Sequence, residues 1–433
     1  MKRIFASLTA MFASTISAFL CVSTPSTSAF LQVAQRPEYS SFVLRYAESP
    51  SPITPESLKK AGYGVPLIAP GNCQLFDPAV EGKLQGTTSL QDRIRLGSKY
   101  SASSVITSTS SVSSLSSTPA NAPVELQEAQ HWLEDIGVPL NFAKPTQPMT
   151  ATVLGRTKLI SDDAPGDIQH VILQLPEGFH YVEGQSLSVI PPGIDPQTGK
   201  GHKPRLYSIA STRYGDLLDG RTVSLCVRRA EYYDPVTGQI DPTKKGVCSH
   251  FLCDTQPGDT VQVAGPVGKT MLLPEQQDAD IIMVATGTGI APFRGFLHRL
   301  FVENTVARHL FRGRAWLILG VPVTGGLLYD AELQAMKDAL AASAAQLEVT
   351  YAISREMKNA KGGKLYVQDV LKQRADELFE RLDKGAVIYF CGLRGMMPGI
   401  LEALEEVASE RGLEWAEKLK QLKDNHQWHV EVY

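Results

Sequence analysis

Short apolar runs separated by polar turns dominate the chain between residues 150 and 230. Each run spans only a few residues, and the turns between the runs contain Gly, Pro and Asp, as is typical of strands joined by tight connections. Strands at this spacing predict an antiparallel β-barrel or sandwich. We expect the strands at 152–154, 170–175, 185–190, 205–211 and 223–227.

Past Pro274 the pattern changes to wholly apolar runs that alternate with helical segments. Such runs are typical of parallel strands that helices cover on both faces. We therefore predict a β-barrel domain at 124–274, suited to a flavin, followed by a doubly wound α/β domain at 275–433, suited to a nucleotide. The four buried strands are expected at 281–285, 315–321, 347–353 and 386–391.

The first 29 residues have the layout of a targeting sequence that is removed from the mature protein. Lys2 and Arg3 precede an apolar run at 4–22, and small residues follow before Phe30. A membrane anchor is the weaker alternative, because Ser and Thr interrupt the run and no stop-transfer pattern follows it. No later part of the sequence is long and apolar enough to span a bilayer, so we expect no transmembrane segment in the mature protein.

Two further segments precede the barrel. Residues 30–100 predict a small module with a strand at 41–46 and a helix opening at Thr54, but its residues indicate no function. Ser and Thr dominate residues 101–123, which cannot bury enough apolar surface to fold and therefore predict a flexible linker. A short amphipathic helix is expected after the linker, at 125–133.

The charge balance argues against a nucleic-acid partner. The sequence carries 42 Lys and Arg against 45 Asp and Glu, whereas a phosphate-binding surface normally needs a basic excess. The six cysteines are widely scattered and form no Cys-x-x-Cys pair, and removal of the presequence leaves an odd number. Neither a disulfide framework nor a metal site is predicted.

A Gly-rich turn is the strongest local feature of the second domain. The expected strand at 281–285 runs into Thr286-Gly287-Thr288-Gly289, and a helix opens behind it. Backbone N–H groups and the positive end of a helix in this setting suit a pyrophosphate. Pro292 stands where the third Gly of the usual dinucleotide motif would be. A purely structural turn is the alternative, and the strand-turn-helix setting favours a nucleotide.

The strand ends of this domain favour NADP over NAD. No Asp or Glu follows the strand at 315–321, where an NAD site would bind the ribose hydroxyls. The next strand instead ends at Ser354-Arg355, and Lys364 and Tyr366 come soon after. A hydroxyl, a guanidinium and an ammonium group suit a 2'-phosphate. The alternative is a solvated basic loop.

In the barrel, Arg205, Tyr207 and Ser208 lie on one expected strand. They offer a phosphate partner, a ring that can stack on a flavin and a hydrogen-bond donor, although a strand Tyr is more often part of the core. Downstream, residues 246–249 precede a helical stretch at 250–253 and offer further N–H groups to a phosphate.

Seven segments occur in order between about residue 200 and the last residue: RLYSIAS (205–211), GVCSHFLCD (246–254), GPVGK (265–269), TGTGIAPFR (286–294), SRE (354–356), CGLRGM (391–396) and WHVEVY (428–433). Together they resemble the plant-type ferredoxin-NADP reductases. The resemblance covers the chain from about Thr150 to its end. It implies an FAD enzyme that takes single electrons from ferredoxin and passes hydride to NADP. Ala285, where the family usually has Gly, and Gly325-Gly326 depart from the pattern. We expect these departures to change nucleotide affinity and not the reaction.

The resemblance also implies the site residues. The flavin-nicotinamide contact would be surrounded by Ser208, Cys391, Glu431 and Tyr433. FAD would be held by Arg205, Leu206, Tyr207, Ser208, Cys226, Val227, Arg228, Tyr232, Val247, Cys248, Ser249, Thr288 and Tyr433. NADP would be held by Ser208, Arg228, Thr288, Val321, Pro322, Ser354, Arg355, Lys364, Tyr366, Gln368, Gly392, Leu393 and Glu431.

The same resemblance assigns roles at the centre of the site. Tyr207 and Tyr433 would stack on opposite faces of the flavin, so Tyr433 must move aside for the nicotinamide. Ser208 and Glu431 would tune the flavin and relay its proton, and Cys391 would position the nicotinamide. From the residues alone, an ordinary buried thiol is the favoured interpretation of Cys391.

Ferredoxin is the implied partner, with flavodoxin as a second carrier. Because ferredoxin is acidic, Lys200, Lys203, Arg205 and Lys269 are candidates for its docking patch, with solvated loop charges as the alternative.

A plastid enzyme behind a secretory-type presequence resembles the bipartite targeting of algae with complex plastids, which places the protein in the stroma near the thylakoids. Two other hypotheses remain: an NADPH flavoprotein serving another carrier, and a component tethered to a thylakoid or antenna complex through residues 30–100.

Overall fold

The structure is a computed structural model, and it describes residues 138–340 and 346–433. The predictions for the presequence, the module at 30–100, the linker at 101–123 and the helix at 125–133 lie outside the described residues. None of the helices within the described ranges is long and apolar enough to cross a membrane. Within the same ranges, no group of three or more His, Cys, Asp or Glu side chains is arranged to hold a metal ion.

The first part of the described chain is a six-stranded sheet whose strands follow the order β4-β3-β6-β1-β2-β5. Every pair of neighbours in this sheet is antiparallel. A bridge between Ile209 and Leu225 then joins the chain after β4 to β5, and the N–H of Ala210 donates to the carbonyl of Ser224 at 2.7 Å. This bridge closes the sheet into the expected barrel. The strands are β1 (Met149–Lys158), β2 (Ile168–Gln174), β3 (Ser186–Ile190), β4 (Arg205–Ser208), β5 (Thr222–Arg228) and β6 (Thr260–Val267), with helices η2 (Pro242–Lys244) and α7 (Val247–Asp254) between β5 and β6.

The barrel core follows from the alternation of side chains along its strands. On β2, Val171 and Leu173 point into the main barrel cluster, whereas Ile172 packs with Leu154 and Leu217 on the other face. Each such fully buried branched side chain contributes about 1.5–3 kcal/mol relative to an exposed one. The alternation therefore fixes which face of each strand lines the barrel.

The second part is a five-stranded parallel sheet in the order β11-β10-β7-β8-β9. Its strands are β7 (Ile281–Thr286), β8 (Arg314–Val321), β9 (Gln346–Ile353), β10 (Val387–Gly392) and β11 (Trp428–Val432). Its helices are η3 (Gly287–Ile290), α8 (Ala291–Leu297), η4 (His298–Val302), α9 (Val306–Leu310), η5 (Thr324–Gly326), α10 (Asp330–Leu340), α11 (Val367–Gln373), α12 (Ala375–Asp383), α13 (Met396–Glu410) and α14 (Trp415–Asp424).

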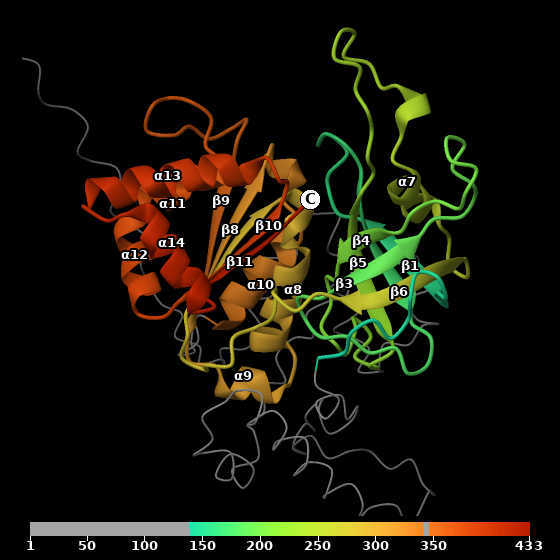
Figure 1. Cartoon of the computed structure of the whole chain (residues 1–433), viewed down its shortest axis with the longest axis horizontal. Coiled ribbons are helices and arrows are strands. Elements are labelled where there is room, and N and C mark those ends of the chain that lie inside the picture. Colours follow the sequence, from blue (N-terminus) through green and yellow to red (C-terminus); the bar gives the residue numbers. More distant parts are fainter. Residues whose placement is uncertain (1–137, 341–345) are drawn as a thin grey trace, which may run out of the picture. The chain divides into compact units, whose positions relative to one another are not determined.

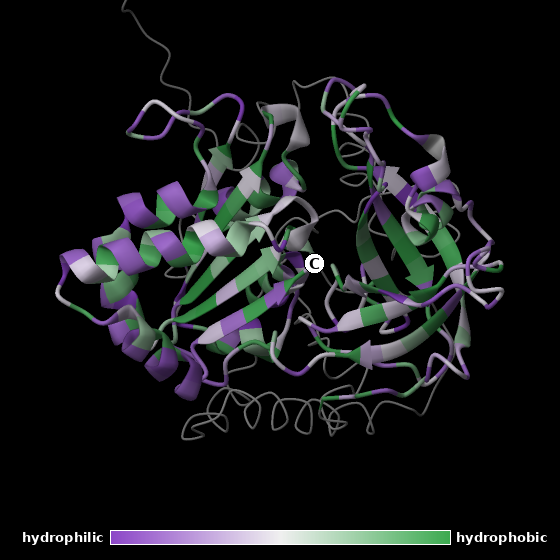
Figure 2. Ribbon diagram, turned by 45° about the horizontal axis from the view of Figure 1, so that its top comes forward, coloured by the Kyte–Doolittle hydropathy of each residue, from purple (hydrophilic) through white to green (hydrophobic). Residues whose placement is uncertain are grey.

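Apolar clusters on both faces of this sheet make it doubly wound. Met283 on β7 belongs to a cluster with residues of α8, η4 and α10, and its neighbour Ile282 belongs to another cluster with residues of α11 to α14. Figure 1 shows these two helix groups on opposite sides of the sheet. In Figure 2 the strands are mainly hydrophobic and the outward sides of α11 to α14 are hydrophilic. The predicted fold class, a β-barrel followed by a doubly wound α/β domain, is confirmed.

Several details differ from the sequence prediction. Strand β6 was not expected, because its Gly265-Pro266 pair is typical of a turn, and β11 was expected only as a motif. Strand β4 ends at Ser208 and not at 211, since the chain leaves β3 there to close the barrel. Helix α7 begins at Val247 and not at 250, because Gly246 in extended backbone already caps it.

Glu303 is a buried carboxyl group that lies between η4 and α9. Both of its carboxyl oxygens lie within hydrogen-bond distance of the Thr212 hydroxyl, at 2.8 and 2.7 Å. Burial, helped by the nearby carboxylates of Glu183 and Asp216, raises the pKa of Glu303 to about 8. At neutral pH, Glu303 therefore keeps its proton in the folded protein. In an unfolded chain it loses that proton near its ordinary pKa of 4.5. The free energy of unfolding therefore falls as the pH rises from about 4.5 to about 8.

Glu303→Gln imitates the neutral carboxyl group and should remove this pH dependence. We expect the Tm of the variant to exceed that of the wild type by several degrees at pH 8, and the difference to shrink towards pH 5. Each 1 kcal/mol shifts Tm by about 2–4 °C in a domain of 150–250 residues. Thermal melts from pH 5 to 8 measure the effect. Glu402→Gln, an exposed change on α13, is the control, and an equal response of both variants would contradict the prediction.

Candidate active site

The Gly-rich turn places the end of β7 against the end of β10. Strand β7 passes directly into η3, and α8 begins after Ile290. The Thr286 hydroxyl accepts the N–H of Leu393 at 3.0 Å. A Cβ atom on Gly289 would lie only 2.1 Å from the carbonyl oxygen of Cys391. Only glycine therefore allows the turn and the Cys391 backbone to approach this closely.

Gly289→Ala should separate these two segments. The added methyl group meets backbone atoms, which cannot turn away as a flexible side chain can, so we expect a Tm lowered by several degrees and at least about tenfold less oxidation of NADPH, the substrate that the resemblance implies. Gly395→Ala is the matched control, because a Cβ at Gly395 meets no atom within 4 Å. A Gly289→Ala variant that melts and turns over like Gly395→Ala would contradict this account.

Four polar side chains from the two sheets meet near this turn. Ser208 on β4 lies opposite Ser186 on β3, and Cys391 on β10 lies opposite Glu431 on β11. The Ser186 hydroxyl donates to Glu431 Oε1 at 2.7 Å, and Ser208 Oγ lies 3.5 Å from the same oxygen. Ser208 Oγ also lies 4.0 Å from the Cys391 sulfur. Strand register in the two sheets therefore assembles the cluster.

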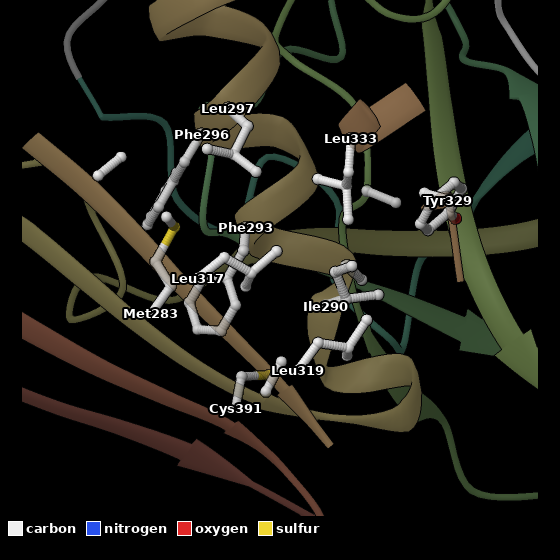
Figure 3. Packing of buried hydrophobic residues seen from close by; sticks show 14 of the residues in the cluster. Met283, Ile290, Phe293, Phe296, Leu297, Leu317, Leu319, Tyr329, Leu333 and Cys391 are labelled. Carbon is white, nitrogen blue, oxygen red and sulfur yellow. The ribbon is translucent and has the colours of Figure 1, made fainter. Parts of the chain in front are cut away.

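The surroundings keep both acidic groups of this cluster protonated to higher pH than usual. Burial raises the pKa of Glu431, and the hydrogen bonds from Ser186 and Ser208 partly offset that rise. Burial, with the nearby Glu431 carboxylate, raises the pKa of Cys391 to about 12. Cys391 is therefore a neutral thiol near pH 7 and no thiolate nucleophile. Figure 3 shows its side chain within the apolar cluster that includes Leu319.

The last residue is fixed by its backbone and less by its side chain. The N–H of Tyr433 donates to the Gly392 carbonyl at 3.0 Å, and the Tyr433 carbonyl accepts the N–H of Arg394 at 2.9 Å. Its hydroxyl lies 2.5 Å from Thr288 Oγ1, and Arg228 lies within electrostatic range of that hydroxyl. The residue is nevertheless 55% exposed. Backbone bonds thus fix the chain end (marked in Figure 1), while more than half of the residue remains exposed.

An apolar and aromatic surface lies beside this cluster. Leu206 is 63% exposed and Val247 is 43% exposed, although both belong to ordered elements. Tyr207 is half-buried, and its hydroxyl interacts with the Cys248 thiol. The first turn of α7 has no side-chain cap, so its N–H groups remain available to an anion. A flat ring with an attached phosphate fits this combination, as FAD requires.

Several other residues assigned to FAD have side chains that are buried or already bonded, so they can offer the cofactor mainly backbone atoms. Cys226, Val227 and Cys248 are buried in apolar clusters, and the Ser249 hydroxyl is used by the backbone of Ala230 and Gly246. By contrast, Arg205, Arg228 and Tyr232 have exposed side chains. The Arg205 guanidinium donates to the carbonyl of Lys203 at 2.9 Å, and Lys244 Nζ lies 4.5 Å from the centre of the Tyr232 ring.

The residues assigned to NADP form two groups. Gly392 and Leu393 lie with the Gly-rich turn. Farther along the sheet edge, the N–H groups of Ser354 and Arg355 donate to the carbonyls of Val321 and Pro322, at 2.9 Å each. These bonds join the ends of β8 and β9, while the Val321 side chain stays in the core.

A hairpin follows Arg355 and carries the remaining basic residues. Lys358 pairs with Lys364 across it, and the Asn359 side chain accepts the N–H of Gly363 at 2.9 Å. Lys364 and Tyr366 are exposed. Gln368 on α11 lies against Gly399 on α13. The arrangement leaves cations and a phenol ring facing solvent beside the strand ends, which suits a phosphate-bearing ribose.

Some residues at the site escaped the sequence analysis. Ser186 gives Glu431 its shortest hydrogen bond, and Thr286, expected only as part of the Gly-rich turn, also holds the loop after β10. The signal for Ser186 was present, since a polar residue in an otherwise buried strand needs a partner. The candidate docking residues Lys200, Lys203 and Lys269 are all exposed, and within the described ranges none of them forms an ion pair closer than 4 Å.

The barrel, the parallel sheet with its Gly-rich turn and the polar cluster where they meet define an FAD-dependent oxidoreductase that also binds a nicotinamide nucleotide. The family model described as "Oxidoreductase NAD-binding domain" matches residues 283–402. The fold is similar to that of ferredoxin-NADP+ reductase from Plasmodium falciparum, with a TM-score of 0.53 and 24% identity, over 68% of this chain and 99% of that one.

The curated relatives give the family. The chain is 50% identical to the chloroplastic ferredoxin-NADP reductase root isozyme 2 of Arabidopsis thaliana, over 81% of this chain and 88% of that protein. It is 50% identical to the chloroplastic ferredoxin-NADP reductase of Chlamydomonas reinhardtii, over 70% of this chain and 84% of that one. A relative from Picosynechococcus is 48% identical over 69% of this chain and 73% of that one. The chain belongs to the ferredoxin-NADP reductase family, and its cofactors are FAD and NADP.

Proposed function

We propose that this protein transfers electrons between ferredoxin and NADP within a plastid, through FAD held against the barrel. The observation that carries the proposal is the meeting of Ser208, Cys391 and Glu431 near Tyr433, whose hydroxyl contacts Thr288. Bound FAD supplies the exchange between single electrons and hydride. The chloroplastic relatives support the plastid.

The residues of the chain divide the remaining work. Burial raises the pKa of Glu431, so its carboxyl group keeps a proton to higher pH than an exposed one, and Ser208 lies between Glu431 and the reacting centre to pass that proton on. The neutral Cys391 thiol orients the nicotinamide without attacking it. Tyr433 would cover one face of bound FAD, exclude water there and give way to the nicotinamide. Arg355, Lys364 and Tyr366 select the 2'-phosphate.

Spectroscopy and kinetics of the purified protein test this function. A yellow protein whose flavin spectrum bleaches with NADPH, and which reduces ferricyanide with NADPH far better than with NADH, supports it. A colourless protein that cannot take up FAD overturns it. A protein that reduces another carrier but not ferredoxin would instead favour an NADPH flavoprotein that serves that carrier.

The direction of flow has a second candidate. Forward flow to NADP serves photosynthesis, but the relatives include proteins named as root and embryo isozymes. That observation favours flow from NADPH to ferredoxin as the alternative. Rates measured in both directions with one ferredoxin at fixed NADP and NADPH concentrations compare the two.

For the carrier, acidic ferredoxin would dock at Lys200, Lys203 and Lys269, and flavodoxin would use the same surface.

The presequence and the module at 30–100 support a finer location. We propose import into a complex plastid of red-algal origin and association with the thylakoid through residues 30–100. Pull-down on thylakoid fractions with the full chain and with a chain lacking 30–100 tests the association. Equal retention of both would discard the tethered role and leave the enzymatic function intact.

A further inference from the structure

Arg294 links the barrel to the nucleotide-binding sheet through both edges of its guanidinium group. Nη1 donates to the carbonyl oxygen of Ala210 and to Asp216 Oδ1, at 2.9 Å each, and both acceptors belong to the barrel part of the chain. On the other edge, Nε donates to Glu332 Oε2 on α10 at 2.8 Å. The side chain is only 2% exposed. One planar group thus binds two partners in the barrel part and one in the nucleotide-binding part.

The bonds of Arg294 lie close to the reacting residues on both sides. Ala210 follows Ser208 by two residues, and α8, which carries Arg294, follows the Gly-rich turn with Thr288 and Gly289. Gly289 packs directly against the Cys391 carbonyl. The same guanidinium therefore anchors the strand that presents Ser208 and the turn that supports Cys391.

The partners of Arg294 are themselves held. Asp216 also contacts His170 Nε2 at 2.9 Å and the Ser224 hydroxyl, and Glu332 contacts His298 Nε2 at 3.0 Å. A buried ion network of this kind adds little net stability compared with apolar packing, but it fixes geometry because each charge needs its partner. Because this network lies between the two cofactor sites, its more important effect is to fix their relative geometry.

We propose that Arg294 is a positioning residue for hydride transfer: through Ala210 and Asp216 it sets the approach of the flavin on the barrel to the nicotinamide on the sheet. The inference rests on the proposed function. Hydride transfer from NADPH moves two electrons and one proton across the two domains, and a misplacement of about 1 Å can cost about 100-fold in rate. Entry of one electron from ferredoxin involves only the flavin side and does not need this alignment.

Arg294→Lys tests the proposal because lysine keeps the charge but cannot bind both domains in the fixed fork geometry. Stopped-flow measurements on the FAD-loaded full chain follow flavin reduction by saturating NADPH, and separately by prereduced ferredoxin without NADP. We expect the NADPH step to slow at least about tenfold and the ferredoxin step to stay within about twofold. Binding of 2'-phospho-AMP, which occupies the sheet alone, should also stay within about twofold.

Two further variants make the result decisive. Asp216→Asn weakens the same link without changing side-chain size and should slow the same step, so the test survives if Arg294→Lys fails to fold. Arg381→Lys is the matched control: Arg381 is 6% exposed and pairs with Glu377 inside the nucleotide-binding part, and its replacement should leave the ratio of the two rates unchanged. The proposal is overturned if Arg294→Lys slows both steps equally. It is also overturned if Arg381→Lys slows the NADPH step as much as Arg294→Lys does. A wild-type protein that performs neither step overturns the proposed function instead.

Discussion

Tyr433→Ser is expected to raise turnover with NADH and to weaken the preference for NADPH. The backbone bonds from Tyr433 to Gly392 and Arg394 do not involve the ring, so the chain end should keep its place when the ring is lost. Among the described residues, the ring forms a hydrogen bond from its hydroxyl to Thr288. Without the ring, the nicotinamide would no longer have to displace the aromatic group that we propose covers the flavin.

The size of the effect follows from the stacking energy. An aromatic pair contributes about 0.5–1.5 kcal/mol beyond its buried area, so kcat/KM with NADH should rise up to roughly tenfold. NADPH should gain less, because we propose that Arg355 and Lys364 bind its 2'-phosphate and anchor it already. Steady-state kinetics with both nucleotides measure the ratio of the two kcat/KM values.

Tyr433→Phe is the control for this prediction. It keeps the ring and removes the hydroxyl bonded to Thr288, so it should retain most of the preference for NADPH. A Tyr433→Ser protein whose NADH turnover and nucleotide preference match the wild type would refute the covering role of the ring. The family membership would be unaffected.

Ser208→Ala should cause the largest loss of activity. Ser208 is the hydroxyl that approaches both Glu431, at 3.5 Å, and Cys391, at 4.0 Å. Positioned proton transfer typically contributes 10²–10⁴-fold, so we expect the rate of flavin reduction by NADPH to fall about 100-fold or more. FAD content and Tm should change little, because the hydroxyl is small and lies at the end of a short strand.

Ser186→Ala provides a matched comparison. Ser186 also donates to Glu431, at 2.7 Å, but no bond links it to Cys391 among the contacts of the described residues. We expect less than about a fivefold loss of rate. The Ser186 bond lowers the pKa of Glu431, so its removal should raise that pKa and move the corresponding limb of the pH-rate profile to higher pH. Equal losses in both serine variants, or a limb that moves to lower pH, would contradict the assigned roles.

Much of the fold was readable because local patterns and tertiary structure agree. The four apolar runs that predicted parallel strands became β7, β8, β9 and β10. Strand β11 escaped because its polar residues obscure the pattern, and it is a strand only through its pairing with β10. Strand β6 escaped because Gly265-Pro266 indicates a turn when its neighbours are unknown.

Sequence by itself determined which residues this protein has for its chemistry: the Gly-rich turn, the basic strand ends and the terminal tyrosine are visible as residue types at a local spacing. Only the tertiary structure decided which of them meet. Ser186 and Glu431 are 245 positions apart, and Arg294 lies 78 positions from Asp216. Such contacts depend on strand register and on the packing of two domains, which are set by the whole core and leave no local signal in the chain.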